Sequence, residues 1–189
     1  MIAIRLLWLV LCLLWLVAEF KLARTKPAEQ PPIDYEQHSQ RWLWLTAVLG
    51  LGVALLFKTW AYVPLPLAYL PRQLLALTLF ASGLTLRYYA IKQLGVLFTT
   101  DVQISPDHQL ISTGVYRTLR HPAYTGLVLA FIAIGIAMGD ALALLAVTLP
   151  LLFALKLRIA LEEDMLCRQF GDTYRNYCHS RWCILPWLW

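Results

Sequence analysis

The chain has 189 residues, of which 60% are hydrophobic and 14% are charged, and it carries a formal net charge of +5 at pH 7. Soluble domains of this size are far less apolar, so the composition excludes that class and indicates a membrane protein. No basic run is dense enough to form a phosphate-backbone groove, and we therefore expect no nucleic-acid partner. The eight Trp and nine Tyr residues suit a protein with many helix ends at the lipid–water boundary.

Apolar stretches in the first half of the chain predict three membrane-spanning helices. Residues 6–18 form the first span, and the chain continues through Glu19 into a basic stretch typical of a stop-transfer sequence rather than of a cleaved signal peptide. Residues 42–57, extended to Trp60, supply the roughly 20 residues that a hydrocarbon core of about 30 Å requires. Residues 72–90 form the third span.

The second half opens with the longest polar segment, residues 91–120, which is followed by uncharged stretches at residues 123–139 and 141–155. These two stretches predict a fourth and a fifth span joined by a tight turn. Residues 158–177 are expected to leave the membrane as a helical extension. The fold prediction is therefore an all-α integral membrane helical bundle with five transmembrane helices and a cytoplasmic C-terminal helical extension.

Basic residues decide the orientation of the predicted spans. Of the 16 Lys and Arg residues, all but Arg5, Lys58 and Arg72 fall on one face of the membrane. Because cytoplasmic loops carry the excess of Lys and Arg, that face is predicted to be cytoplasmic. The C-terminus, the polar segment and the C-terminal helix then share one side and are placed to form one site.

The candidate site centres on residues 114–126, G-V-Y-R-T-L-R-H-P-A-Y-T-G. Pro122 fits the first position of the fourth helix, where its missing N–H costs nothing. The amides that follow are predicted to be unpaired, and with the helix dipole, Arg117, Arg120 and His121 they predict an anion site. The alternative is a basic loop that only fixes the topology.

Arg158 and Glu162 lie one helical turn apart and are predicted to project from one face of the fifth helix. In the functional interpretation, Arg158 meets an anionic substrate and Glu162 meets a cationic cofactor. The alternative is a snorkelling arginine paired with a glutamate for solubility.

Cys178, His179 and Cys183 resemble a metal cluster superficially. A zinc site of this kind needs a second, properly spaced pair of ligands, which the sequence lacks. We therefore expect no metal and no disulfide.

The motifs R-H-P-A-Y-T-G, R-x-x-x-E-E and F-G-D-x-Y-x-x-Y, followed by a late proline, resemble the isoprenylcysteine carboxyl methyltransferase family in order and spacing. Related membrane methyltransferases act on phospholipids. The resemblance covers residues 101–186. It implies S-adenosyl-L-methionine as cofactor, S-adenosyl-L-homocysteine as product and a lipid-like or prenylated acid as substrate. It also implies a division into residues 1–100, with the first three spans, and residues 101–189, the methyltransferase core.

Carried over by motif, the resemblance implies a role for individual residues of this chain. Arg158 matches the family's substrate-side arginine, which is expected to meet the carboxylate that receives the methyl group and is the predicted catalytic residue. The expected cofactor-binding residues are His108, Gln109, Leu110, Ile111, Tyr116, His121, Pro122, Ala123, Tyr124 and Glu162.

A carboxylate acceptor is favoured because it is already ionised at pH 7, so methyl transfer from a sulfonium needs no general base. One alternative is a phospholipid amine N-methyltransferase, which would need a base and gain little from Arg158. A second is a sterol-type, NADPH-dependent membrane reductase, since such proteins carry a similar Arg-His-Pro-x-Tyr turn. A third is a membrane scaffold without a ligand. Membrane lipids are the other expected partners.

Overall fold

The computed structural model describes residues 2–23, 34–36, 39–60, 62–98, 102–104 and 110–185. Six α-helices make up most of this part of the chain, and two short strands and two 3₁₀ turns connect them. The helices are α1 (Ile2–Ala23), α2 (Ser39–Trp60), α3 (Tyr69–Leu94), α4 (Pro122–Met138), α5 (Ala141–Phe170) and α6 (Asp172–His179). The strands β1 (Asp34–Glu36) and β2 (Val102–Ile104) pair antiparallel, and the 3₁₀ turns are η1 (Gly95–Leu97) and η2 (Gly114–Arg117).

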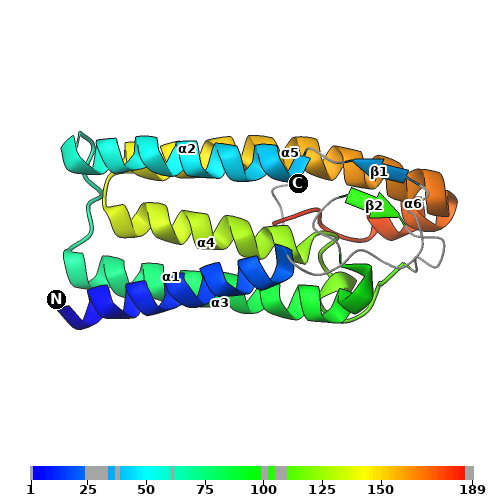
Figure 1. Cartoon of the computed structure of the whole chain (residues 1–189), viewed down its shortest axis with the longest axis horizontal. Helices are drawn as coiled ribbons and strands as arrows, with labels where there is room; N and C mark the ends of the chain where they lie inside the picture. Colours follow the sequence, from blue (N-terminus) through cyan, green and yellow to red (C-terminus); the bar gives the residue numbers. More distant parts are fainter. Residues whose placement is uncertain are drawn as a thin grey trace.

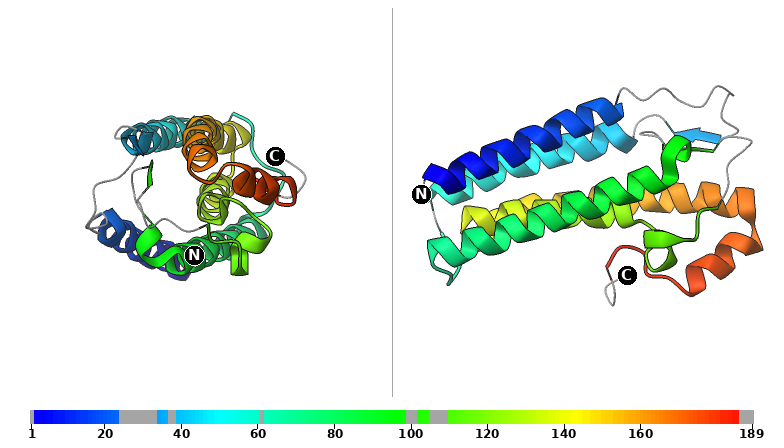
Figure 2. Two further views of the ribbon diagram at one scale, coloured as in Figure 1. Left: turned by 90° about the vertical axis from the view of Figure 1, so that its right-hand side faces the viewer. Right: turned by 90° about the horizontal axis from the view of Figure 1, so that it is seen from below.

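The five long helices run nearly parallel to one axis, with α4 in the centre (Figure 1). One side of α4 faces α3, which lies beside α1, and the other side faces α5, which lies beside α2 (Figures 1 and 2). The strands and α6 gather at one end of the bundle, here called the polar end (Figure 1). The turns that join α2 to α3 and α4 to α5 lie at the opposite end.

Glycine residues allow the central helices to approach closely. A Cβ atom built on Gly83 of α3 would lie 2.6 Å from the carbonyl oxygen of Gly126 in α4. On the other side of the bundle, a Cβ on Gly50 of α2 would lie 2.8 Å from the carbonyl oxygen of Ala146 in α5. Small residues let helix backbones pack tightly in lipid, where apolar burial provides little driving force. Gly83 and Gly126 therefore mark the close crossing of α3 and α4.

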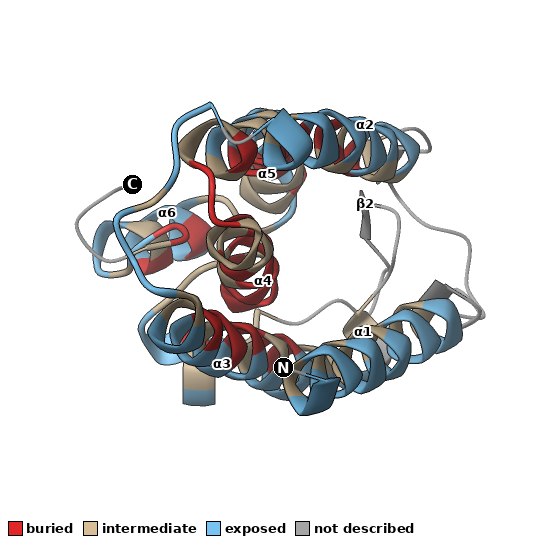
Figure 3. Cartoon of the chain, turned by 90° about the vertical axis from the view of Figure 1, so that its left-hand side faces the viewer, coloured by how far each residue is buried: buried red, intermediate tan, exposed pale blue. Residues whose placement is uncertain are grey.

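Burial increases from the outer helices toward α4 (Figure 3). The central helix is the most enclosed, whereas α1 is exposed along most of its length. Helix α1 contacts α3 through apolar side chains, among them Trp8 and Trp15 against Phe80, and through two polar contacts. Trp8 Nε1 donates to Gln73 Oε1 at 2.7 Å, and Glu19 pairs with Arg87. The exposed apolar surface of α1 is consistent with a helix that faces lipid.

The predicted all-α membrane bundle is confirmed. Four described helices, α1, α2, α3 and α5, are long and apolar enough to cross a membrane, and α4 is shorter with 17 residues. The predicted fifth helix and most of its predicted extension form one element, because α5 continues without interruption from Ala141 to Phe170. The break comes at Gly171, where a positive φ of 55° starts α6. The pair β1–β2 was not predicted.

Candidate active site

Tyr124 lies at the centre of a charged network at the polar end. Arg158 Nε donates to the Tyr124 hydroxyl at 2.8 Å, and that hydroxyl donates to Glu162 Oε2 at 2.8 Å. The second donor of the same guanidinium, Arg158 Nη1, bonds Ser39 Oγ at the start of α2 at 2.6 Å. Arg158 is 4% exposed. Its orientation is therefore set by helices α2 and α4 together.

His121 lies between two neighbouring acids of α5. Its Nε2 is 3.0 Å from Glu163 Oε1, whereas its Nδ1 is 3.7 Å from Glu162 Oε1, too long for a hydrogen bond. A carboxylate only accepts, so the proton of this contact sits on Nε2. The His121 ring stacks on Tyr124 with centroids 5.5 Å apart. Glu163 thus holds His121 from one side, while Glu162 stays bonded to Tyr124.

Glu163 also forms an ion pair with Arg120, whose Nε lies 3.3 Å from Glu163 Oε1. Burial lowers the pKa of Arg120, but the hydrogen bond to Cys178 and the charge of Glu163 raise it more, so the net shift is upward. Arg120 therefore remains a cation at every relevant pH. Its charge offsets that of Glu163, and the second acid, Glu162, is left to meet other groups.

Residues 181–185 form a C-terminal strap that lies against the loop before α4. Arg120 N–H donates to the Trp182 carbonyl at 2.8 Å, and His121 N–H donates to the Cys183 carbonyl at 3.0 Å. Thr125 Oγ1 donates to the Ile184 carbonyl at 2.6 Å. These bonds bury His121 to 4% exposure and fix the loop that carries the R-H-P motif.

A second group of predicted residues packs beside this network rather than inside it. Tyr116, Ala123 and Ile111 form an apolar cluster with Ala90 of α3, and the Tyr116 hydroxyl donates to the Ala90 carbonyl at 3.4 Å. Tyr177 of α6 donates to the Tyr116 carbonyl at 2.9 Å. Burial raises the pKa of Tyr177 to about 12, so this donor keeps its proton. These contacts connect η2 to α3 and α6.

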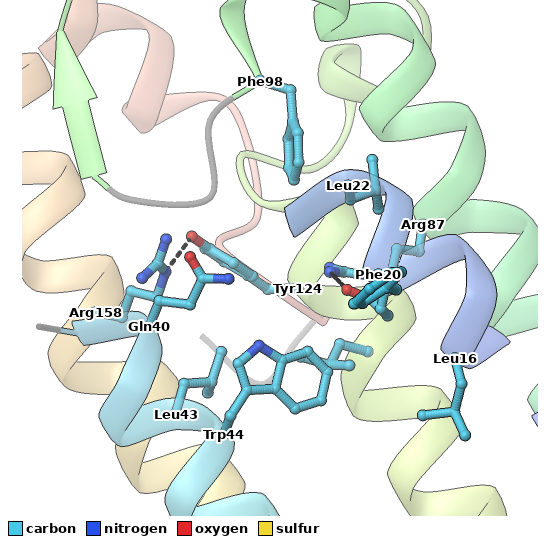
Figure 4. A pocket seen from close by; sticks show the side chains of 12 residues that line it. Leu16, Phe20, Leu22, Gln40, Leu43, Trp44, Arg87, Phe98, Tyr124 and Arg158 are labelled. Carbon is cyan, nitrogen blue, oxygen red and sulfur yellow. Dashed lines mark hydrogen bonds and ion pairs between the residues drawn. The ribbon is translucent and has the colours of Figure 1, made fainter. Parts of the chain in front are cut away.

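A pocket of about 330 Å³ opens beside Tyr124 and Arg158, between α1 and α2 (Figure 4). Its walls are mostly apolar. The polar side chains that reach it come from two sides, with Arg158, Tyr124 and Gln40 on one and Arg87 on the other (Figure 4). Glu19 lines the pocket as the ion-pair partner of Arg87. The apolar lining residues are Leu16, Phe20, Leu22, Leu43, Trp44, Phe98 and Leu127. The shape and lining suit a molecule with one charged group and an apolar chain.

The structure brings four of the predicted site residues, His121, Tyr124, Arg158 and Glu162, into one network. Pro122 is buried at the first position of α4, as predicted. Leu110 is half-buried and precedes the cluster of Ile111, Tyr116 and Ala123. His108 and Gln109 lie outside the described residues. Whether any of them binds a cofactor stays a prediction.

One expectation about the start of α4 was wrong. The amides after Pro122 were predicted to be unpaired, but the Tyr124 and Thr125 amides both donate to the His121 carbonyl, at 3.1 and 3.0 Å. The turn is tightened by an i to i−3 hydrogen bond, which uses a donor that an anion would need. Arg120 is paired with Glu163 as well. Neither the Tyr124 amide nor Arg120 is therefore left to bind the predicted anion.

The sequence analysis missed several residues of this site. Glu163, Ser39 and Gln40 belong to the network or the pocket, and so does the pair of Glu19 and Arg87. Arg87, near the end of the third predicted span, is 9% exposed and pairs inward with Glu19. The available signal was Glu19, which directly follows the first apolar stretch, since acids in or next to a span are costly unless they have a partner.

His121, Glu163 and Cys183 present ligand atoms within 4.8 Å of one another, a spacing that one metal ion accepts. Arg120 lies against the same carboxylate, and its positive charge opposes a cation there. Burial, followed by the charge of Glu163, raises the pKa of the Cys183 thiol, which keeps it protonated rather than in the thiolate form that binds metals. The prediction that the protein uses no metal stays a prediction.

The fold and the site define a class: a helical membrane protein with a buried charged network at the polar end of its bundle, next to an apolar pocket. Comparisons with known proteins identify the family. The model of the isoprenylcysteine carboxyl methyltransferase (ICMT) family matches residues 74–168, half of the chain. The chain belongs to this family. The resemblance seen in the sequence motifs is thereby confirmed.

Individual relatives agree with this assignment. A probable protein-S-isoprenylcysteine O-methyltransferase of Oryza sativa subsp. indica is 32% identical over 114 residues, 59% of this chain and 60% of that protein. Methanethiol S-methyltransferase 1 of Bradyrhizobium diazoefficiens is 38% identical over 73 residues, 39% of this chain and 25% of that protein. The solved structure of the eukaryotic intramembrane Ras methyltransferase ICMT is 28% identical, with a TM-score of 0.63, over 81% of this chain and 55% of that one. The chain thus covers less than two thirds of each relative's length.

Proposed function

We propose that the protein is an S-adenosyl-L-methionine-dependent membrane methyltransferase that methylates the carboxylate of a lipid-like acid, as in isoprenylcysteine carboxyl methylation. The observation that carries this proposal is the position of Arg158. This cation is 4% exposed, is oriented by Tyr124 and Ser39, and lines an apolar pocket. A buried arginine beside an apolar cavity suits an acceptor that has a carboxylate head and a hydrocarbon chain.

Arg158 is assigned the acceptor carboxylate. Its guanidinium orients the two oxygens while the chain of the acceptor lies among the apolar side chains of α1 and α2. Low water content strengthens the attraction between the guanidinium and the carboxylate. With the cofactor bound, the acceptor carboxylate held by Arg158 would take the methyl group from the sulfonium without loss of a proton. The chain therefore needs no general base at this site.

Glu162 and its neighbours are assigned the cofactor. The side chain of Glu162 is 31% exposed, so its carboxylate can accept hydrogen bonds from an ammonium group or from ribose hydroxyls. The acid therefore fits a cationic cofactor. S-adenosyl-L-methionine supplies, when bound, a methyl group activated by a positively charged sulfur. Tyr124, bonded to both Glu162 and Arg158, sets the spacing between the cofactor and the acceptor, because in-line transfer requires the reacting atoms within about 3.5 Å.

A second candidate acceptor is a small thiol. One relative is named methanethiol S-methyltransferase 1, so proteins that share this segment differ in the group they methylate. A thiol is uncharged at neutral pH and gains less from a buried arginine than a carboxylate does. The size of the pocket and its charged wall favour the lipid-like acid.

We also propose that the polar end, and with it the site, faces the cytoplasm, because basic residues are concentrated there.

Two measurements on the purified protein test this function. Isothermal titration should detect S-adenosyl-L-homocysteine binding and no NADPH binding, which separates a methyltransferase from a reductase. Radiolabelled S-adenosyl-L-methionine and N-acetyl-S-farnesyl-L-cysteine should then give a product whose label is released by mild base, as expected for a methyl ester. A label that survives base would indicate a thioether or an amine product. If the protein bound neither S-adenosyl-L-homocysteine nor NADPH, the proposal would be overturned.

A further inference from the structure

Glu19 and Arg87 form a bidentate ion pair within the membrane-spanning part of the bundle. Arg87 Nε lies 2.6 Å from Glu19 Oε1, and Arg87 Nη2 lies 2.9 Å from Glu19 Oε2. Trp15 Nε1 donates to the same acid at 3.0 Å, and Arg87 Nη1 donates to the Ala123 carbonyl at 3.3 Å. The pair therefore joins α1, α3 and the first turn of α4.

This ion pair faces the pocket rather than a closed core. The side chains of Arg87 and Glu19 are 11% and 15% exposed, and both line the cavity. Arg87 lies on the side away from Arg158 (Figure 4). Charged residues in a span are costly and mark functional sites when they border a cavity. The pocket thus has two polar walls, with apolar side chains between them.

The pair keeps unused hydrogen-bonding capacity, and both of its side chains line the pocket. Arg87 uses three of its five N–H groups in the described part of the chain. Glu19 accepts three hydrogen bonds there, and a carboxylate can take about four. A ligand group that both donates and accepts is complementary to this arrangement. An amide does so, with its N–H toward Glu19 and its carbonyl toward Arg87.

We propose that Glu19 and Arg87 form a second polar subsite of the acceptor pocket, one that binds an amide adjacent to the carboxylate held by Arg158. The proposal rests on the function proposed above. It selects an N-acylated amino acid, or the C-terminal residue of a peptide, over a simple isoprenoid or fatty acid. A hydrocarbon offers nothing to the pair, and leaves its donors and acceptor without a partner in the pocket.

The two walls come from different parts of the chain. Arg158, Tyr124 and Arg87 fall within residues 74–168, which match the family, whereas Glu19 lies outside them on α1. The family-matched segment therefore binds the carboxylate of the acceptor. Helix α1 contributes Glu19, which recognises the amide next to that carboxylate. Acceptor selectivity of this chain is set in part by its first helix.

The competing interpretation is that the ion pair only attaches α1 to the bundle. A second polar contact provides the matched control, because Trp8 donates to Gln73 at 2.7 Å and joins the same two helices without lining the pocket. Trp8→Phe removes that hydrogen bond and keeps an aromatic ring next to Phe80. It weakens the attachment of α1 while the proposed subsite stays intact.

The experiment compares two acceptors on the full chain in lipid nanodiscs: N-acetyl-S-farnesyl-L-cysteine and S-farnesyl-3-mercaptopropionic acid, which lacks the acetamido group. The affinity of each is measured with S-adenosyl-L-homocysteine present, and kcat and KM are measured with S-adenosyl-L-methionine. The natural chain should prefer the amide by about tenfold, the value of one hydrogen bond to a charged group, mainly through KM. The double variant Glu19→Leu/Arg87→Met should lose this preference, since replacing both charges leaves neither unpaired.

Trp8→Phe should retain the tenfold preference. Equal affinity of the natural chain for the two acceptors would overturn the proposal, as would a preference that persists in the double variant or disappears in Trp8→Phe. If the double variant does not fold, Glu19→Gln serves instead and should reduce the preference to about threefold. If no methyl ester forms, the proposed function fails, and the two affinities still decide whether the pair binds an amide.

Discussion

Arg158 Nε donates a hydrogen bond of 2.8 Å to the Tyr124 hydroxyl, so the guanidinium proposed to bind the acceptor is oriented from α4 rather than from its own helix. The same hydroxyl donates to Glu162 at 2.8 Å. Arg158 and Glu162, one turn apart on α5, are thus connected through Tyr124. The tyrosine couples the groups assigned to the acceptor and to the cofactor.

Tyr124→Phe should lower kcat/KM by roughly 10- to 30-fold, because it removes two hydrogen bonds to charged partners that together contribute about 2 kcal/mol. The ring and its stacking on His121 remain, so the thermal unfolding midpoint should change little. Tyr88→Phe, at a 62% exposed position of α3, is the control and should behave as the natural chain. An unchanged kcat/KM in Tyr124→Phe would show that the bridge has no role in turnover.

Arg158 and Glu162 should respond differently to substitution. Arg158→Ala should abolish most turnover and leave S-adenosyl-L-homocysteine affinity nearly intact, because its interaction is with the acceptor. Arg158→Lys should rescue only part of the activity, since a point charge loses the bidentate geometry that orients a carboxylate. Glu162→Gln should instead weaken cofactor affinity. Titration and steady-state kinetics measure both effects, and an equal loss of cofactor affinity in all three variants would refute the assignment.

The sequence predicted the helices of this protein well because lipid imposes a strong length and composition requirement on each span. It also predicted that His121, Tyr124, Arg158 and Glu162 meet. It did not predict the roles of Glu19 and Arg87, which lie 68 positions apart in the chain. Each looks like an isolated charge near a helix end, and only the packing of α1 against α3 joins them. The contact of the C-terminal strap with the loop before α4 was not predictable either. The His121 amide donates to the Cys183 carbonyl, and a backbone hydrogen bond leaves no side-chain pattern in the sequence.

The orientation prediction is tested by labelling single cysteines with a reagent that cannot cross membranes. Asp140 is a poor label position, because it is 1% exposed and its carboxylate caps α5 by accepting from the Ala143 amide. Tyr62 at one end and Lys92 at the polar end are exposed. With the native cysteines replaced by alanine, Tyr62→Cys should label in intact cells and Lys92→Cys only after permeabilisation. The reverse pattern would place the polar end outside.

Because Cys183 lies buried in the C-terminal strap, we expect its thiol to be alkylated slowly. The thiol is 1% exposed, and burial, together with the nearby Glu163 charge, raises its pKa. A raised pKa keeps the thiol protonated up to a higher pH, and only the thiolate reacts with iodoacetamide. At pH 8, Cys183 should therefore be alkylated more than tenfold slower in the folded protein than after denaturation, whereas the half-buried Cys178 should differ less. Mass spectrometry of each cysteine peptide gives both rates. Rapid alkylation of Cys183 in the folded protein would mean that the strap does not cover the site.

The close crossing of α3 and α4 should make Gly126 sensitive to a single methyl group. A Cβ on Gly126 would lie 2.4 Å from the Gly83 carbonyl oxygen and 2.8 Å from the Arg87 amide nitrogen. These are backbone atoms, so the helices themselves must separate, at a cost on the order of 1–3 kcal/mol. Gly126→Ala should therefore lower the thermal unfolding midpoint in detergent. Gly52→Ala is the matched control, because a Cβ on Gly52 meets nothing within 4 Å, and it should be neutral or slightly stabilising.

The same substitution should also reduce activity more than its effect on stability explains. Gly126 lies on α4 between Tyr124 and the wall of the pocket formed by Leu127, and its new methyl group would press on Arg87. Separation of α3 from α4 moves Arg87 away from the Ala123 carbonyl and shifts the pocket wall opposite Arg158. At a temperature where both variants are fully folded, Gly126→Ala should therefore raise KM for the acceptor severalfold while Gly52→Ala leaves it unchanged. If Gly126→Ala is as stable and as active as Gly52→Ala, the two helices do not cross at this distance, and the position of Arg87 in the pocket is wrong as well.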